Sequence, residues 1–273
     1  MPSLVNPLLA QPEPADHLVQ FYGDEACLAQ NVSLYLREGA ERGDGMILIA
    51  TSAHADLFAR HLRAAGTDPD ELSRAGRLVV LDAERTLSQF LVDGLPDWER
   101  FDSVVGGVVR SARRRAGSAG IRAYGEMVDL LWRAGRLAAA TRLEEFWNRL
   151  LARDRFGLFC AYTVDLLGDD VRAETLGEML RNHTHLLPVR TNGELDHAVG
   201  RALADVLGAE RSAALMPLIR ATRYPRTQIP DAEAAVLWLK NHVPPYADAV
   251  LARARAYYES ECARTGGSPE GSP

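Results

Sequence analysis

The sequence predicts an α/β protein in which a wound, mostly parallel sheet is flanked by helices and followed by a small all-helical C-terminal region. Three observations lead to this prediction. Short apolar segments alternate with amphipathic segments as far as residue 182, the connections are too long for hairpin turns, and residues 194–263 show helical patterns only. Strands joined by helical crossovers form parallel sheets, because antiparallel neighbours need only a short turn.

Five apolar segments are predicted to be the strands of this sheet. They are short and uninterrupted, as expected for strands that are buried on both faces. The predicted strands begin near residues 17, 46, 77, 121 and 157. Helical spacing of three and four residues, as in Leu28, Val32, Tyr35 and Leu36, predicts a helix in every gap. Apart from the helical segment between the strands near residues 121 and 157, the predicted helices span residues 23–43, 52–65, 86–92, 98–115 and 171–182.

The ends of the chain and the C-terminal third are predicted to differ from the sheet domain. Residues 1–15 contain four prolines and little periodicity, so a flexible arm is expected there. The sheet domain is predicted over 16–189, where Pro188 ends the regular structure. A helical domain is expected over 194–263, and residues 264–273 are expected to be disordered. The four helices predicted in the helical domain are 195–207, 210–221, 231–242 and 246–262.

Composition places the chain among ordinary cytoplasmic globular proteins. It has 273 residues, of which 47% are hydrophobic and 25% are charged, with a net charge of −6. No apolar run approaches the roughly 18 residues of a membrane helix, and the N-terminus lacks the positive region of a secretory signal. The negative charge argues against direct nucleic-acid binding. Cys27, Cys160 and Cys262 are too scattered for a disulfide framework, so free thiols are expected.

Polar and aromatic side chains at the ends of two predicted strands suggest a site. Tyr124 and Glu126 end the strand near residue 121, and Cys160 and Tyr162 end the next one. Ligands of open parallel sheets bind beyond the carboxyl ends of the strands. Glu126 could bind a polar group there or act as a base. The alternative is that its carboxylate only stabilises the N-terminus of the following helix.

Six segments of the sequence, in order, resemble one known family. They are His17–Tyr22, Gly76–Asp82, Tyr124–Trp132, Arg142–Asn148, Cys160–Tyr162 and His183–His185. Together they resemble the MEDS domain, the methanogen/methylotroph sensory domain of the DcmR type, over residues 16–188. The resemblance implies a ligand-sensing module on a RecA/KaiC-like scaffold, with simple organic molecules as ligands.

The segment after the first predicted strand argues against nucleotide hydrolysis on that scaffold. An active nucleotidase carries G-x-x-x-x-G-K-[ST] there, so that backbone amides and the lysine hold the phosphates. This chain has Phe21–Leu28 instead, without a lysine or a glycine pair. Asp24 and Glu25 would repel a triphosphate, so ATP hydrolysis is not expected.

Eight side chains are predicted to contact the ligand in an apolar cavity with a few orienting polar groups. These residues are His17, Tyr22, Tyr124, Glu126, Trp132, Trp147, Cys160 and Tyr162. Glu144, Trp147 and Asn148 share one helix face by their spacing of three and four residues. Core packing is the commoner role for Trp132 and Trp147, and a small core residue is the commoner role for a cysteine such as Cys160.

No metal or other cofactor is predicted, although one combination of residues leaves a metal open. His17, His183 and His185 with Cys160 could form a site, because imidazole and thiolate suit zinc or copper. His183 and His185 would point apart on a helix, and only an extended segment would present both rings together. Helix capping and ordinary hydrogen bonding are the alternative roles.

These observations predict a non-catalytic regulatory protein that senses a small hydrocarbon-like molecule. The helical C-terminal region would relay the signal to a protein partner, with a homodimer as one route. Two alternatives remain open at this point. One is an enzyme that uses Glu126 with a metal held by histidine and cysteine, and the other is a degenerate nucleotide-binding scaffold.

Overall fold

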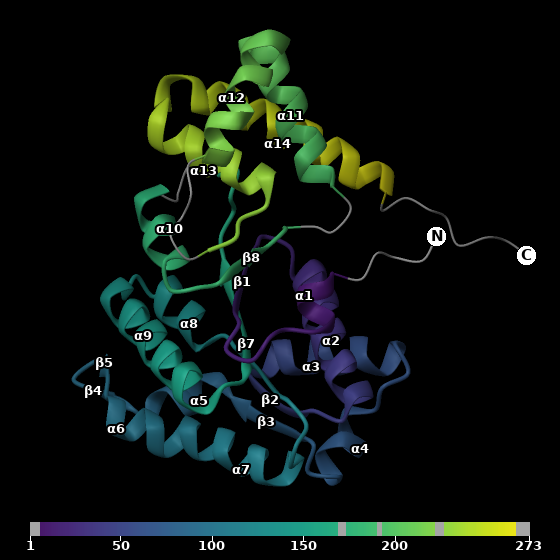
Figure 1. Cartoon of the computed structure of the whole chain (residues 1–273), viewed down its shortest axis with the longest axis vertical. Helices are drawn as coiled ribbons and strands as arrows, with labels where there is room; N and C mark the ends of the chain where they lie inside the picture. Colours follow the sequence, from purple (N-terminus) through teal and green to yellow (C-terminus); the bar gives the residue numbers. More distant parts are fainter. Residues whose placement is uncertain (1–5, 169–172, 190–192, 222–226, 266–273) are drawn as a thin grey trace, which may run out of the picture.

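The computed structural model describes residues 6–168, 173–189, 193–221 and 227–265. At its centre lies a sheet of six parallel strands in the order β3-β2-β6-β7-β1-β8 (Figure 1). In chain order these strands are β1 (His17–Tyr22), β2 (Gly45–Ala50), β3 (Leu78–Asp82), β6 (Ile121–Gly125), β7 (Gly157–Thr163) and β8 (His185–Leu187). The predicted α/β class and the five predicted strands are confirmed.

The sixth strand, β8, was not expected from the sequence. It is three residues long and pairs with residues 18–20 of β1. Three residues carry too little alternation to be distinguished from a loop, and the following proline suggested an end of regular structure. Because β8 adds to the outer side of β1, the strand β1 becomes an interior strand with β7 on its other side.

Two groups of helices cover the two faces of the sheet, on opposite sides of it in Figure 1. One group is α1 (Pro7–Ala10), α2 (Glu25–Arg42), α3 (Ser52–Ala64) and α4 (Pro69–Arg74). The other is α5 (Ala83–Ser88), α6 (Trp98–Phe101), the π-helical turn η1 (Asp102–Gly106), α7 (Gly107–Ala116), α8 (Met127–Arg133) and α9 (Leu137–Asp154). Each face has its own hydrophobic core.

The structure corrects the expected flexible arm over residues 1–15. Residues 1–5 lie outside the described residues, but α1 is a helix whose Leu9 is completely buried. The guanidinium of Arg122 on β6 donates to Leu9 O and Ala10 O, at 2.9 Å each. These hydrogen bonds hold residues 9 and 10 against the sheet. They cannot be predicted from the local sequence, because Arg122 lies more than a hundred residues away.

Two helices near the middle of the chain also differ from expectation. The helix expected over 86–92 is α5, which begins at Ala83 because the Asp82 side chain accepts from Arg85 N. It ends at Ser88, and a hairpin of β4 (Leu91–Val92) and β5 (Leu95–Pro96) follows. Gly94 has a φ of 82° in the hairpin turn, a conformation that glycine adopts without strain. The helix expected over 98–115 contains the π-helical turn η1.

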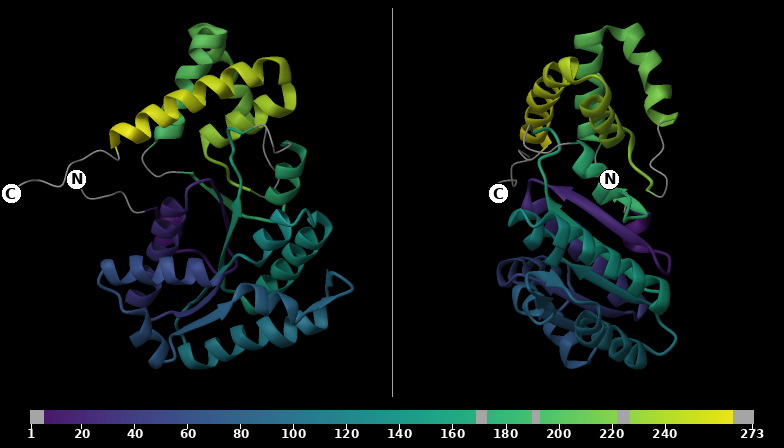
Figure 2. Two further views of the ribbon diagram at one scale, coloured as in Figure 1. Left: turned by 180° about the vertical axis from the view of Figure 1, so that it is seen from behind. Right: turned by 90° about the vertical axis from the view of Figure 1, so that its left-hand side faces the viewer.

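The predicted C-terminal helices are present, and they pack against the sheet domain. After α10 (Ala173–Leu180) they are α11 (Glu194–Leu207), α12 (Ala209–Ala221), α13 (Asp231–His242) and α14 (Pro244–Thr265), drawn in green to yellow in Figure 2. Leu195, Val236 and Val250 belong to the same hydrophobic core as Leu166 and Leu186. The expected disordered tail lies outside the described residues from 266 onward, whereas residues 264 and 265 are helical.

The described part of the chain contains no helix that combines the length and apolar character needed to cross a membrane. Among the described residues, neither Cys27 nor Cys160 forms a disulfide, and Cys160 is buried. The side chain of Cys262 lies outside the described residues, and so do residues 171 and 172 of the helix expected over 171–182.

Candidate functional site

The first polar group, the Glu126 network, comprises Glu126, Thr51, His54 and Tyr124. Glu126 follows β6, and Thr51 follows the neighbouring strand β2, so the parallel register brings their backbones together. The carboxylate accepts from Thr51 N, from His54 Nδ1 at 2.6 Å and from the Tyr124 hydroxyl at 3.4 Å. The hydrogen bond to Glu126 raises the pKa of His54. Glu126 is 3% exposed, and groups of the protein itself donate these three hydrogen bonds to its carboxylate.

A second group lies at the carboxyl ends of β1 and β7. Asp129, in the first turn of α8, accepts from Thr163 N at 2.7 Å and from the Tyr22 hydroxyl at 3.4 Å. Arg133 Nε lies 3.1 Å from the same carboxylate. Burial raises the pKa of Asp129, and burial together with the Asp129 charge raises the pKa of Tyr22. These contacts hold Tyr22 in one orientation beside the end of the sheet.

A third group, the Glu144 cluster, comprises His17, Glu144, Cys160 and His183. The four residues come from β1, α9, β7 and the turn between α10 and β8, and each is at most 1% exposed. One ligand atom from each lies within 4.8 Å of the other three. His17 Nε2 is 3.4 Å from Cys160 Sγ and 3.3 Å from Glu144 Oε2.

The hydrogen bonds around the Glu144 cluster define the tautomers of its histidines. His17 Nδ1 faces Asn148 Oδ1 and Asn182 O, both at 2.9 Å, and His183 Nδ1 faces Met179 O at 2.8 Å. Carbonyl oxygens only accept, so Nδ1 carries a proton in both rings, and Nε2 of each ring faces the Glu144 carboxylate. Burial and the neighbouring His183 lower the pKa of His17 to about 4, which leaves it neutral.

The remaining atoms of the Glu144 cluster are incompletely paired. The Tyr162 hydroxyl donates to Glu144 Oε1, whereas Glu144 Oε2 and His183 Nε2 have no hydrogen-bond partner. Burial opposes ionisation of Glu144, but the neighbouring His183 and His17 and the hydrogen bond from Tyr162 together outweigh it and lower its pKa. Burial raises the pKa of Cys160, so the isolated thiol keeps its proton. The donor set of two imidazoles, a thiol and a carboxylate suits a transition-metal ion.

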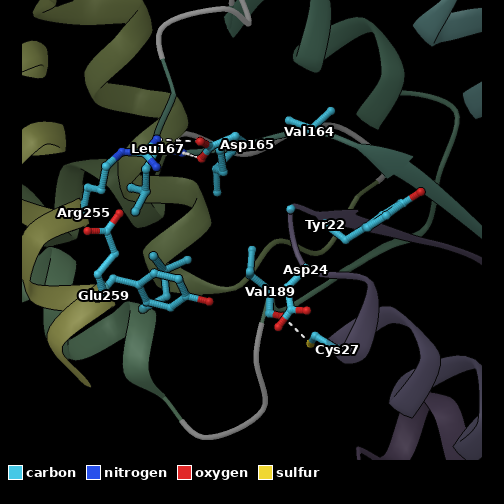
Figure 3. A pocket seen from close by; sticks show the side chains of 13 residues that line it. Tyr22, Asp24, Cys27, Val164, Asp165, Leu167, Val189, Arg255 and Glu259 are labelled. Carbon is cyan, nitrogen blue, oxygen red and sulfur yellow. Dashed lines mark hydrogen bonds and ion pairs between the residues drawn. The ribbon is translucent and has the colours of Figure 1, made fainter. Parts of the chain in front are cut away.

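A cavity of about 220 Å³ lies between the sheet domain and the C-terminal helices (Figure 3). Its walls come from the turn after β1, the loop after β7 and helices α11 and α14. In Figure 3, Asp165 and Arg255 meet on one side of it, and Tyr22, Asp24 and Cys27 lie on the other. The lining residues are Tyr22, Gly23, Asp24, Cys27, Val164, Asp165, Leu166, Leu167, Val189, Leu195, Arg255, Tyr258 and Glu259.

The structure does not gather the eight predicted ligand-binding residues around one cavity. Tyr22 and Tyr124 belong to the core on the α2 and α3 face, whereas Trp147, Cys160 and Tyr162 belong to the core on the opposite face. Only Tyr22 lines the 220 Å³ cavity. A separate cavity of about 20 Å³ is lined by residues that include Trp132, Glu144 and Tyr162.

Several predicted residues are packed in the interior. Tyr124 is fully buried, with its ring in edge contact with Phe58 and Phe159 at centroid distances of 5.4 and 5.5 Å. Trp147 packs edge-on against Phe101 at 5.2 Å. The commoner role considered for Trp147, core packing, therefore matches its position. Trp132 contacts the Tyr162 ring at 5.9 Å, beside the smaller cavity.

The structure separates the two histidines that were considered together as metal ligands. His183 joins the Glu144 cluster, whereas His185 lies on β8, with Nδ1 3.8 Å from Asp16 Oδ1. Sequence reasoning missed Glu144 as the fourth member, although its position on the helix face shared with Asn148 was recognised. It also missed Thr51 and His54, which the rule about carboxyl ends of strands could have found, because Thr51 follows β2 directly and His54 lies in the first turn of α3.

Comparison with known protein families gives one match. Residues 16–184, more than half of the chain, match the family described as MEDS: MEthanogen/methylotroph, DcmR Sensory domain. All four members of the Glu144 cluster lie inside the matched segment, whereas helices α11 to α14 lie outside it. No curated protein matches the chain.

Proposed function

Because this chain belongs to the MEDS family of sensory domains, we propose that it is a non-catalytic regulatory protein that senses a small organic molecule. The 220 Å³ cavity is the proposed ligand site, and its position is the observation that carries the proposal. It lies beyond the carboxyl ends of β1 and β7, where ligands of parallel sheets bind. The C-terminal helices form its other wall, so a ligand would contact both parts of the chain.

The lining of the cavity restricts the class of ligand. Aliphatic and aromatic side chains form most of its walls, and a cavity of about 150 Å³ is enough to hold benzene. Among the described residues that line the cavity, Asp24, Asp165 and Glu259 contribute carboxylates and Arg255 a cationic side chain, which pairs with Asp165 at 2.6 Å. We therefore expect a small, mostly apolar molecule that is neutral or cationic, and we expect anions to be excluded.

Contacts next to the cavity provide a path for the signal. Arg255 on α14 pairs with Asp165 after β7, and the Cys27 thiol on α2 donates to Val189 O at 2.9 Å. Val189 N in turn donates to Glu233 on α13 at 2.9 Å. A ligand that fills the cavity would favour one packing of α13 and α14 over another, which a protein partner or a second copy of the chain could recognise.

We propose further that the scaffold is related to RecA and KaiC and that the protein is cytoplasmic. The proposed domains are a sensory domain over 16–189 and a helical domain over 194–263. The contrast with nucleotide-binding relatives of that scaffold is supported by the start of α2. The Asp24 side chain there accepts from Ala26 N, so a carboxylate takes the place that a phosphate would need.

Three ligands of similar size test the proposal: benzyl alcohol, benzylamine and benzoate, which are neutral, cationic and anionic. Titration calorimetry of the full chain should detect binding of the first two and none of benzoate. Leu195→Trp should remove binding by filling the cavity, whereas Val80→Trp, at a residue 47% exposed on β3, should retain it. Binding of benzoate alone, or equal binding by Leu195→Trp, would contradict the proposal.

The relay has its own measurement. Hydrogen exchange of the full chain should show slower exchange in α14 when benzyl alcohol or benzylamine is bound, because the ligand adds contacts to that helix. The same experiment on Leu195→Trp should show no change on addition of the ligand. Binding without any change in α13 or α14 would separate ligand sensing from the proposed relay.

A further inference from the structure

We propose that the Glu144 cluster is a binding site for a divalent transition-metal ion, with Zn²⁺ as the expected occupant. The ligand atoms would be His17 Nε2, Glu144 Oε2, Cys160 Sγ and His183 Nε2. One ligand atom from each of these residues lies within 4.8 Å of the other three, and the residues come from four separate parts of the fold. The site is distinct from the 220 Å³ cavity, none of whose lining residues it contains.

Distances in the cluster agree with tetrahedral coordination. Zinc bonds of about 2.0 to 2.3 Å place neighbouring ligand atoms about 3.3 to 3.8 Å apart in a tetrahedron. The observed separations of His17 Nε2 from Glu144 Oε2 and Cys160 Sγ are 3.3 and 3.4 Å. His183 Nε2 is 3.4 Å from the other oxygen of Glu144. Small movements of the side chains would therefore complete the coordination shell.

The unpaired atoms in the cluster indicate a cation. His17 Nε2 and Glu144 Oε2 present lone pairs, and His183 Nε2 faces the same carboxylate, while Asn182 O and Met179 O engage the Nδ1 protons of the two rings. Such atoms repel one another in a buried site unless a positive charge lies between them. Two of the three have no hydrogen-bond partner at all. A metal ion would satisfy all three atoms together.

Surrounding groups resemble the outer shell of a metal site. Metal-binding histidines commonly donate their second ring nitrogen to a carbonyl or a carboxylate, which orients the ring. Both histidines of the cluster do so here. Asn148 Nδ2 also donates to Asn182 Oδ1 at 3.3 Å, and this bond orients Asn148 so that its Oδ1 faces His17. The Tyr162 hydroxyl holds Glu144 Oε1 and leaves Oε2 directed at the proposed ion.

Charge balance favours a divalent ion. The Cys160 thiol would release its proton to solvent on binding and become a thiolate, which is the ligating form. One thiolate, one carboxylate and two neutral imidazoles carry two negative charges, so a divalent ion gives a neutral complex. A neutral complex suits a site whose four side chains are at most 1% exposed. Four protein ligands leave no open position, as in metal sites that stabilise a fold.

The proposed ion would connect the sheet to the C-terminal helices. His183 precedes β8, and its carbonyl lies 2.9 Å from the Thr227 hydroxyl, four residues before α13 begins. Thr184 N donates to His17 O at 2.8 Å. Metal binding would therefore order the turn from which the chain crosses to the helical region. The cavity of about 20 Å³ beside Glu144 and Asn182, large enough for one water molecule, marks the side from which an ion could approach.

Cobalt spectroscopy on the full chain tests the proposal. The protein is unfolded with a chelator, refolded with one equivalent of Co²⁺, and then titrated with Zn²⁺. We expect intense d–d absorption of tetrahedral cobalt and a sulfur-to-cobalt charge-transfer band, both lost as Zn²⁺ displaces the cobalt. A wild-type chain without the charge-transfer band overturns the proposal, whatever the variants show.

Variants identify which residues hold the ion. The double variant Cys27→Ser/Cys262→Ser should keep the charge-transfer band, since only Cys160 remains. Cys160→Ser should lose that band, and His183→Gln should bind Co²⁺ at least about tenfold more weakly. Circular dichroism after refolding shows whether each variant is folded. If the double variant loses the band, or if folded Cys160→Ser keeps it, the ion is bound elsewhere and the proposal is wrong.

Discussion

Glu126 and Glu144 are both buried, at 3% and 1% exposure, but their surroundings differ in kind. Glu126 is surrounded by donors, namely a backbone amide, an imidazole N–H and a tyrosine hydroxyl. Glu144 has one donor, Tyr162, and otherwise faces Nε2 of His17 and Nε2 of His183 without a hydrogen bond to its Oε2. The protein itself supplies the hydrogen-bond donors that stabilise the Glu126 carboxylate at the end of β6. Glu144 lacks such donors and would be stabilised by a bound cation. Burial alone does not distinguish the two.

A third buried carboxyl group, Glu233 on α13, shows another way to avoid an unpaired charge. It is 1% exposed, and burial raises its pKa to about 7 from the ordinary value of 4.5. It therefore keeps a proton over much of the range in which other glutamates are ionised. Its described partner is Val189 N at 2.9 Å. The three residues thus illustrate a paired carboxylate, a protonated carboxyl group and a proposed metal ligand.

The largest effect is expected for Glu233. Between pH 4.5 and 7 the unfolded chain has released a proton that the folded chain retains, so the free energy of unfolding falls as pH rises through this window. The full difference corresponds to about 3 kcal/mol. Glu233→Gln should remove this part of the pH dependence and stabilise the protein at pH 8. Urea unfolding at pH 5 and pH 8 measures both effects.

The exposed residue Glu210 provides the control, because Glu210→Gln should leave the pH dependence of the wild-type chain unchanged. An unaltered pH dependence in Glu233→Gln would show that Glu233 is ionised in the folded protein. Burial would then not be sufficient to keep the Glu233 carboxyl group protonated.

A matched pair of substitutions separates Glu126 from Glu144 most sharply. Glu126→Gln should destabilise the protein by about 1–3 kcal/mol, because its amide group cannot accept from all the donors around it. Glu144→Gln should change the stability of the metal-free chain by less than about 1 kcal/mol, or stabilise it, because the new N–H₂ can donate to a ring lone pair. Glu144→Gln should also remove the rise in melting temperature that Zn²⁺ gives the wild-type chain.

The exposed neighbour Glu145 supplies the control, since Glu145→Gln should keep both the stability and the response to Zn²⁺. A protonated His183 paired with Glu144 would behave differently. Breaking such a buried pair costs about 3–5 kcal/mol. A loss of that size in metal-free Glu144→Gln would mean that a proton, rather than a metal ion, is the cation of the cluster.

The smallest effect is expected for His54. Its pKa is raised by the hydrogen bond to Glu126, so the stability it contributes is present below pH 6.5 and is lost as pH rises through its pKa in the folded state. His54→Gln should destabilise the protein by about 1 kcal/mol at pH 5.5, after allowance for partial exposure, and by less at pH 9. Thermal unfolding at the two pH values checks this. Equal losses would mean that the charge on His54 contributes nothing to the Glu126 network.

The sequence was sufficient for most of the fold, because periodicity within one segment reports secondary structure. It placed five of the six strands and all four helices of α11 to α14. It failed where a distant contact decides the outcome. The helix α1 depends on bonds from Arg122, and the strand β8 depends on pairing with β1.

The same limit explains the candidate site. Alternation along β7 correctly put Cys160 and Tyr162 on one side of the strand, and both lie in the same core. Relating them to Tyr124 required the register between β6 and β7, which pairs Tyr124 with Phe159 and places it on the opposite face. His17, Cys160 and His183 were recognised as a possible set of metal ligands. The position of Glu144 among them could not be known before α9 was packed on the sheet.

X-ray absorption at the zinc edge, on the 273-residue chain refolded with one equivalent of Zn²⁺, measures whether Glu144 holds a metal ion. We expect one sulfur ligand at about 2.3 Å and three nitrogen or oxygen ligands at about 2.0–2.2 Å, with the outer-shell scattering of two imidazoles. In Glu144→Gln this signature should be lost. A zinc spectrum without any sulfur ligand, or one that is identical in Glu144→Gln, would contradict the account.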